Sequence, residues 1–189
     1  MSSNSNYTTQ NELLLNNLMD FYKDEIILSR MLKIITGESK ISLRIVDWFV
    51  TNYAKKNYTL YNFYDINNNI IRFKVYFDYK LKLKAYSKKR FDPFCRWDRI
   101  SIPYKNETCI ETTIGQLNFF KWAIENKIIE YIEENYDTIE KDMNNRNSTS
   151  KRKETITDNS KTRKKREELS ISATKSIKKE EVEIVVQFK

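Results

Sequence analysis

The segment IRFKVYFDYKLKLKAY, residues 71–86, decides the predicted fold. Its odd positions from Ile71 to Ala85 are apolar, and its even positions from Arg72 to Tyr86 are charged or tyrosine. An alternation with a period of two is typical of a half-buried strand, and the length of this one suggests a bulge or a bend. The pattern predicts that one face enters the core while lysines and arginines two apart project together into water.

Helices are predicted before this strand. Apolar residues recur at three- and four-residue steps over residues 11–36 and stop at Gly37, and a break near Lys23 would divide this stretch into two short helices. A second apolar face covers residues 42–56, where Ser39 or Ser42 supplies the cap. We interpret Trp48 as a core aromatic residue rather than a stacking platform.

A last helix and short strands are predicted after it. Thr113 and Gln116 fit a capping box, and the helix that follows should run to about Met143 with an acidic exposed face. Residues 59–64, 100–104 and 108–112 are strand-like, and Pro103 places the second of these at a sheet edge. The predicted class is therefore α+β, with two N-terminal helices, a small antiparallel sheet and a long C-terminal helix packed on the sheet.

The domain organisation follows from changes in composition. Residues 1–10 are predicted to form a disordered N-terminus, residues 11–143 one α+β domain, and residues 144–180 a disordered basic tail that is poor in apolar side chains. Residues 181–189 end the chain with a strand-like pattern. With 40% hydrophobic residues, the chain is too apolar to be disordered throughout.

Composition argues against an enzyme. Histidine is absent, which removes the commonest general base and metal ligand, and two glycines cannot build a Gly-rich phosphate loop. We expect no catalytic residues, no metal and no cofactor.

The spacing of Cys95 and Cys109 matches no zinc or thioredoxin-like pattern, so two free thiols are the default, and a pair bridged across a hairpin is the alternative. No secretory signal and no apolar run long enough to span a bilayer is present, so we expect no membrane partner and an intracellular location.

Charge is segregated along the chain. Residues 1–71 have no net charge, residues 72–99 carry +7, residues 100–143 carry −5 and residues 144–189 carry +6. A basic block directly before an acidic one creates opposite local fields, which affect association more than folding.

The basic block is the first candidate site, for nucleic acid or another polyanion. Phosphates need cations that follow a backbone, and single strands also stack on exposed rings such as those of Tyr76, Tyr86 and Trp97. The candidate cations are Arg72, Lys74, Lys80, Lys82, Lys84, Lys88, Lys89, Arg90, Arg96 and Arg99. The competing interpretation is a solvated sheet face whose lysines neutralise the acidic last helix, between Glu125 and Asp142.

The tail holds two further candidates. A nuclear import signal or a flexible polyanion arm is predicted from the spacing of Lys151, Arg152, Arg163, Lys164, Lys165 and Arg166, against the alternative of a solubilising tail. A strand is indicated by alternate apolar residues at Val182, Ile184, Val186 and Phe188. This strand would return to the domain's own sheet or add to the sheet of a partner protein, unless the segment is unstructured.

A remote alternative is a Mg²⁺-dependent nuclease. Asp78-Tyr79-Lys80 on a strand, with Asp65 at an upstream turn, is similar to the spaced acid and acid-x-Lys pattern of restriction-type nucleases. The pattern is very short, and chance matches are frequent.

Three phrases resemble a family of small uncharacterised proteins from nucleocytoplasmic large DNA viruses, the mimivirus-like and chlorella-virus-like group. They are GESKISLRIVDWFVTNYAKKN (37–57), LKAYSKKRFDPFCRWDRI (83–100) and ETTIGQLNFFKWAIENKIIEYI (111–132), within a resemblance over about residues 11–143. The resemblance carries over no catalytic or binding residue. It implies a viral product in an infected eukaryotic cell, acting in a virus factory, the nucleus or the virion.

The leading hypothesis is a non-enzymatic viral protein that binds nucleic acid, in viral gene expression or genome packaging. The alternative is a structural or interaction protein whose basic face meets an acidic viral or host protein, with its C-terminal strand as the docking peptide.

Overall fold

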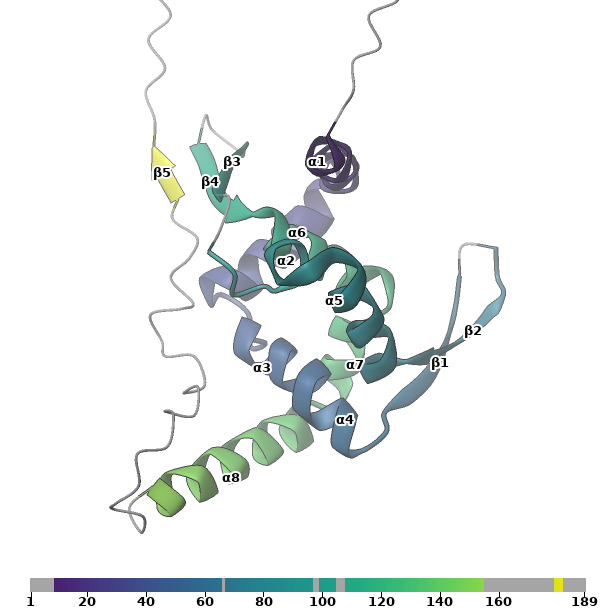
Figure 1. Cartoon of the computed structure of the whole chain (residues 1–189), viewed down its shortest axis with the longest axis vertical. Coiled ribbons are helices and arrows are strands. Elements are labelled where there is room, and N and C mark those ends of the chain that lie inside the picture. Colours follow the sequence, from purple (N-terminus) through teal and green to yellow (C-terminus); the bar gives the residue numbers. More distant parts are fainter. Residues whose placement is uncertain (1–8, 66, 97–98, 105–107, 155–178, 182–189) are drawn as a thin grey trace, which may run out of the picture.

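Helices make up most of the structure, a computed structural model that describes residues 9–65, 67–96, 99–104, 108–154 and 179–181 (Figure 1). Two small antiparallel sheets accompany them, so the α+β class is confirmed. The first sheet is the hairpin of β1 (Leu60–Tyr64) and β2 (Ile70–Lys74), and the second has the order β3 (Arg99–Pro103), β4 (Thr108–Thr113), β5 (Lys179–Glu181). The helices are α1 (Gln10–Phe21), α2 (Glu25–Thr36), α3 (Leu43–Trp48), the π-helix η1 (Phe49–Tyr53), α4 (Ala54–Lys56), α5 (Val75–Phe91), α6 (Ile114–Glu125), α7 (Ile128–Glu134) and α8 (Tyr136–Glu154).

The N-terminal helices begin and end at residues suited to those places. The first predicted helix is divided after Phe21, as its break near Lys23 allowed, and Asp24 caps the second piece by accepting from the backbone of Ile26. Gly37 ends that piece with φ of 81°, a left-handed conformation that glycine adopts without strain. Ser42 caps α3 as predicted, and Trp48 is buried in the core as predicted.

The segment 71–86 differs most from its prediction. Only the part up to Lys74 is a strand, and the strand predicted beyond it is wrong because residues 75–91 form α5, which is kinked at Ser87, where φ is 63°. The partner strand β1 begins at Leu60, which pairs with Lys74, so a longer β2 would have no strand opposite it. A helix satisfies its own backbone hydrogen bonds and therefore needs no such partner.

The core of the molecule is built around α6. Almost every residue from Ile114 to Ala123 is buried, and α5 lies along α6 (Figure 1). Aromatic rings fill the contact between the two helices: Tyr79 and Phe91 of α5 lie 5.8 and 5.5 Å from the ring of Trp122. The Trp122 indole N–H also donates to the Asp78 carboxylate at 2.6 Å, which fixes the rotation of α5 about its axis.

The predicted C-terminal helix is present in three pieces. Thr113 caps α6 by accepting from the backbone N–H of Gln116, as predicted. The chain then turns at Lys127, where φ is 57°, and again at Asn135 before α8 begins. α8 continues past the predicted end at Met143 to Glu154, and it packs against α3 and η1 rather than on a sheet.

The second sheet agrees with its sequence pattern. β3 lies at an edge, as Pro103 predicted, and both cysteines are free thiols. β5 pairs antiparallel with β4, so the chain returns to its own sheet at Lys179–Glu181. The docking strand predicted at Val182, Ile184, Val186 and Phe188 lies outside the described residues, as do Arg163, Lys164, Lys165 and Arg166 of the tail cluster. Lys151 and Arg152 lie in the last turns of α8.

Candidate polyanion interface

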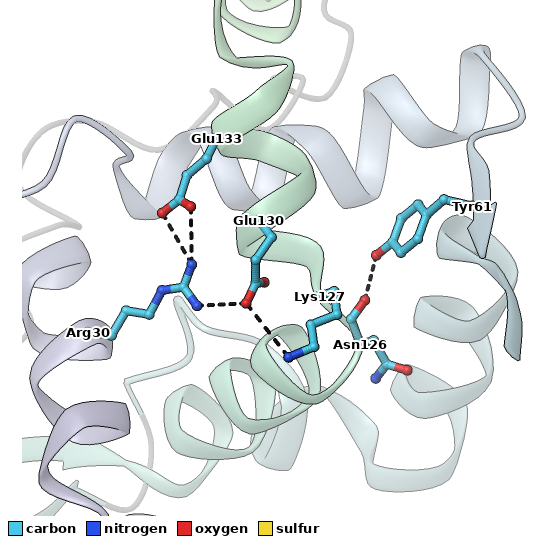
Figure 2. Close-up of polar contacts among 6 residues, drawn as sticks. All are labelled: Arg30, Tyr61, Asn126, Lys127, Glu130 and Glu133. Carbon is cyan, nitrogen blue, oxygen red and sulfur yellow. Dashed lines mark hydrogen bonds and ion pairs between the residues drawn. The ribbon is translucent and has the colours of Figure 1, made fainter. Parts of the chain in front are cut away.

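The outer face of the hairpin carries the first two predicted cations. Arg72 pairs with Asn62 and Lys74 with Leu60 across the two strands, and all four side chains are exposed. The other face of the hairpin packs on the body of the protein, where the Tyr61 hydroxyl donates to the Asn126 carbonyl at 2.6 Å (Figure 2). Burial raises the pKa of Tyr61 far above its ordinary value, so this hydroxyl stays protonated and remains a donor.

The exposed side of α5 continues this surface. Lys80 and Lys84 are one turn apart and exposed, and beside them Phe77 and Leu81 are 59% and 66% exposed. The Lys74 ammonium lies 6.0 Å from the centre of the Phe77 ring, which connects the hairpin to the helix. We call this the α5–hairpin surface; it comprises Arg72, Lys74, Phe77, Lys80, Leu81 and Lys84, all of which precede the kink of α5 at Ser87.

Helix formation separates residues that the strand prediction placed together. Lys82 is half-buried at the side of α5 that faces α1, where it lines a cavity of about 320 Å³ with Asn17 and Lys121. Tyr76 and Tyr86 are also half-buried, and Tyr86 stacks on Phe91 with the ring centres 6.0 Å apart. These two tyrosines therefore do not offer the exposed rings that the alternation predicted.

The predicted cations in the last turn of α5 and beyond it differ in their contacts and exposure. Arg90 lies 3.5 Å from the Gln10 side chain, and Arg99 forms an ion pair with Glu111 at 3.1 Å. Lys89 and Arg96 are exposed. Trp97 lies outside the described residues.

The cations of the α5–hairpin surface have no carboxylate partners among the described residues. Arg72, Lys74, Lys80 and Lys84 form no ion pair with any described residue, and outside this surface Lys82 and Lys88 form none either. The positive charge of this surface is therefore available to another molecule.

Several carboxylates of the acidic helices pair with cations from outside α5. Arg30 of α2 donates to Glu130 at 2.8 Å and to Glu133 at 3.2 Å, and Lys127 approaches Glu130 at 4.0 Å (Figure 2). Partial burial lowers the pKa of Arg30, but its bonds to the two carboxylates outweigh burial and leave the pKa raised. Lys40 and Lys56 pair with Asp137 and Asp142 in the same way. Among the described residues, Arg72, Lys74, Lys80, Lys82 and Lys84 form no ion pair with the acidic helices, so direct pairing of the kind that the alternative interpretation required is not seen for these cations.

The geometry that suggested a nuclease is absent. Asp78 and Lys80 lie on a helix and not on a strand, so Asp78 turns inward to Trp122 while Lys80 is exposed. Asp65 lies in the hairpin turn, where its carboxylate accepts from Asn69 and those hydrogen bonds lower its pKa. In the described ranges, no three acidic or cysteine side chains gather as metal ligands.

Sequence reasoning missed the exposed apolar side chains of this region. Seven large hydrophobic residues between positions 58 and 81 are exposed, whereas the described remainder of the chain has only Leu13 and Ile26; the seven are Tyr58, Leu60, Tyr64, Ile70, Ile71, Phe77 and Leu81. A helical projection of residues 75–86 would have shown Phe77 and Leu81 beside Lys80 and Lys84. The strand interpretation placed both apolar residues in the core instead.

The fold and the comparisons with known proteins together define the class of this protein. It is a small α+β viral protein with a basic, partly apolar surface. The chain belongs to a family of unknown function (DUF7197), whose model matches residues 2–188. This match extends beyond the predicted residues 11–143 at both ends, and together with a mimivirus relative it confirms the predicted giant-virus family.

One relative is the uncharacterized protein L507 of Acanthamoeba polyphaga mimivirus. It is 46% identical over 158 residues, which cover 80% of this chain and 60% of the relative. The chain thus spans about 60% of the length of that relative. No solved structure matches the chain. Within the part of the chain that the structure describes, every helix is too short or too polar to cross a membrane.

Proposed function

We propose that this is a non-enzymatic viral protein that binds nucleic acid through the α5–hairpin surface, in the gene expression or genome packaging of the virus in the infected cell. The observation that carries the proposal is the set of cations of this surface with no carboxylate partner among the described residues: Arg72, Lys74, Lys80 and Lys84. The extended ribbon that first suggested polyanion binding is not formed, so the proposal now depends on charge on a helix and a hairpin.

Helical spacing is compatible with phosphate contacts. Lys80 and Lys84 lie one turn apart, about 6 Å along the helix axis, and the phosphates of one DNA strand repeat every ~3.4 Å along its axis, so the two lysines would contact alternate phosphates. Flexible lysine side chains adapt to the remaining difference. The basic residues of the C-terminal tail would add contacts that do not depend on sequence.

Salt-dependent binding of the full chain to labelled oligonucleotides tests the proposal. Each phosphate contact contributes about 0.7–0.9 to the slope of log affinity against log salt, so K80Q/K84Q should reduce that slope by about 1.5. The matched control is K33Q/K141Q, which removes the same charge from exposed lysines of α2 and α8. An affinity that is absent at about 50 mM salt, or that falls equally in both variants, would contradict the proposal.

A second candidate function is docking on an acidic viral or host protein. The exposed Leu81 and Ile70 favour it, because apolar side chains contribute to protein interfaces and are not needed for phosphate contacts. A photo-reactive amino acid at position 81 should then cross-link, in infected cells, to one acidic peptide sequence. Loss of that cross-link on deleting residues 182–188 would support the predicted docking strand, whereas cross-links to nucleic acid alone would exclude this candidate.

A further inference from the structure

The hairpin has a strand edge that no described strand covers. Val75 N–H donates to the Thr59 carbonyl at 3.3 Å and Asp65 N–H to the Asn69 carbonyl at 3.0 Å, at the two ends of the hairpin ladder. Bonded and non-bonded residue pairs alternate in an antiparallel ladder. The odd residues of β1 therefore bond to β2, and the even residues direct their N–H and C=O groups to the free edge; these are Leu60, Asn62 and Tyr64.

The two edges of the hairpin differ in charge. β1, with the sequence LYNFY, has no charged residue, no proline and no glycine. β2 directs the backbone of Arg72 and Lys74 to its own edge. Natural sheets protect exposed edges with charges, prolines or bulges, and β1 has none of these. β1 is thus the edge that is open to pairing with another strand.

The edge of β1 is complementary to itself. If two copies pair antiparallel about Asn62, Asn62 lies opposite Asn62 of the second copy, and Leu60 lies opposite Tyr64. Each of these residue pairs would exchange both backbone hydrogen bonds, because all three residues direct their polar groups outward. Pairing two copies through β2 would instead place Arg72 opposite Arg72, which like-charge repulsion opposes.

We infer that the partner of this edge is a second copy of the chain, bound through β1 to form a four-stranded sheet in the order β2-β1-β1-β2 about a two-fold axis at Asn62. Packing of Tyr61 and Phe73 on the body of the protein already stabilises the hairpin, and pairing through β1 would add hydrogen bonds to the outward N–H and C=O groups of its free edge. The exposed Leu60 and Tyr64 side chains of the two copies would cover one another on its outer face. Arg72 and Lys74 of both copies would share that face.

The interface is short, so we expect a weak dimer with a dissociation constant in the micromolar range. Sedimentation of the full chain without nucleic acid tests it. The average mass should rise with concentration toward twice the 22.8 kDa of one chain. A mass that stays at 22.8 kDa up to millimolar concentration would overturn the inference.

Two proline variants identify the edge. N62P removes an outward N–H from β1, and R72P removes one from β2 at the residue directly opposite, so each leaves the bonds between β1 and β2 in place. N62P should be monomeric and R72P should dimerise like the wild type, with unchanged thermal unfolding as the check on folding. Dimerisation that survives N62P, or is lost only in R72P, would contradict pairing through β1.

Charge exchange gives a test that does not depend on proline. L60K/Y64K opposes lysines at both outer pairs of the dimer, and L60E/Y64E opposes glutamates there. Each variant alone should be monomeric, and an equimolar mixture should form a heterodimer. A mixture that stays monomeric while each variant remains folded would overturn the proposed register. Because nucleic acid is absent from these measurements, their outcome is independent of the proposed function.

Discussion

α5 and α6 lie against each other, yet only α6 is enclosed. α6 is apolar on nearly all sides because α1, α5, α7 and β4 surround it, and its residues from Ile114 to Ala123 are buried apart from Lys121. α5 buries Val75, Tyr79 and Phe91 and leaves its other side exposed. Exposed lysines beside exposed Phe77 and Leu81 are not explained by folding. The comparison therefore separates residues that hold the structure together from residues that are available for binding.

The two helices should differ most in how much stability is lost when a phenylalanine is replaced by alanine. Phe119→Ala in α6 removes a fully buried ring and should lower the free energy of unfolding by about 3–5 kcal/mol. Phe77→Ala in α5 should change it by less than about 0.5 kcal/mol, because the ring is mostly exposed. Urea unfolding of both variants measures this. A large loss in Phe77→Ala would show that the outer side of α5 also belongs to the core.

The stability of the protein should depend nearly as strongly on the close approach of α5 and α6 at Gly115. A Cβ atom on Gly115 would lie 2.9 Å from the Lys89 carbonyl oxygen and 3.0 Å from that of Asp92, so the end of α5 must move to admit it. We expect Gly115→Ala to cost about 1–3 kcal/mol by the same unfolding measurement. Unchanged stability would mean that the two segments separate without cost.

The hydrogen bond between the helices is the next test. Trp122→Phe removes the donor and leaves the half-buried Asp78 carboxylate without it, at an expected cost of about 1–3 kcal/mol. Asp78→Asn is the matched control, since its amide oxygen still accepts and should lose less. If both variants lose the same amount, the charge of Asp78 and not this bond would be the stabilising feature.

The smallest effect should come from the helix starts. Thr113 caps α6, while Lys74 gives α5 no side-chain cap. Thr113→Ala should therefore cost about 1 kcal/mol, and Thr113→Ser, which keeps the hydroxyl, should cost little. Thermal unfolding compares the two variants, and an equal loss in both would show that the methyl group of Thr113 matters more than the cap.

Local signals in the sequence predicted much of the fold correctly. Gly37, Ser42 and Thr113 mark helix ends through backbone conformation and side-chain caps, which depend on only a few neighbouring residues. Pro103 indicated an edge strand because it lacks an N–H, which is also a local property. Trp48 was placed in the core from the apolar periodicity of its own helix.

The residues 75–86 could not be predicted in the same way. Their alternation also contains the helical series Val75, Tyr79, Leu83 and Tyr86, which packs toward the core. Helix and strand are therefore both consistent with the apolar pattern. The pairing within the hairpin decides between them, because β1 begins opposite Lys74 and offers no strand to the residues that follow. The strand prediction affected the candidate site most, because it exchanged buried and exposed residues. In the structure Tyr76 and Tyr86 are half-buried, whereas Phe77 and Leu81 are exposed.

The sequence by itself determined the α+β class, the separation of basic and acidic blocks, the caps of the helices and the giant-virus family. These features depend on composition and short-range spacing. Only the tertiary structure decided that α5 is a helix, that Arg30 rather than α5 neutralises Glu130 and Glu133, and which cations remain available. The physical reason is that backbone groups and charges take whichever partners the fold brings within reach, and those partners lie far apart in the sequence.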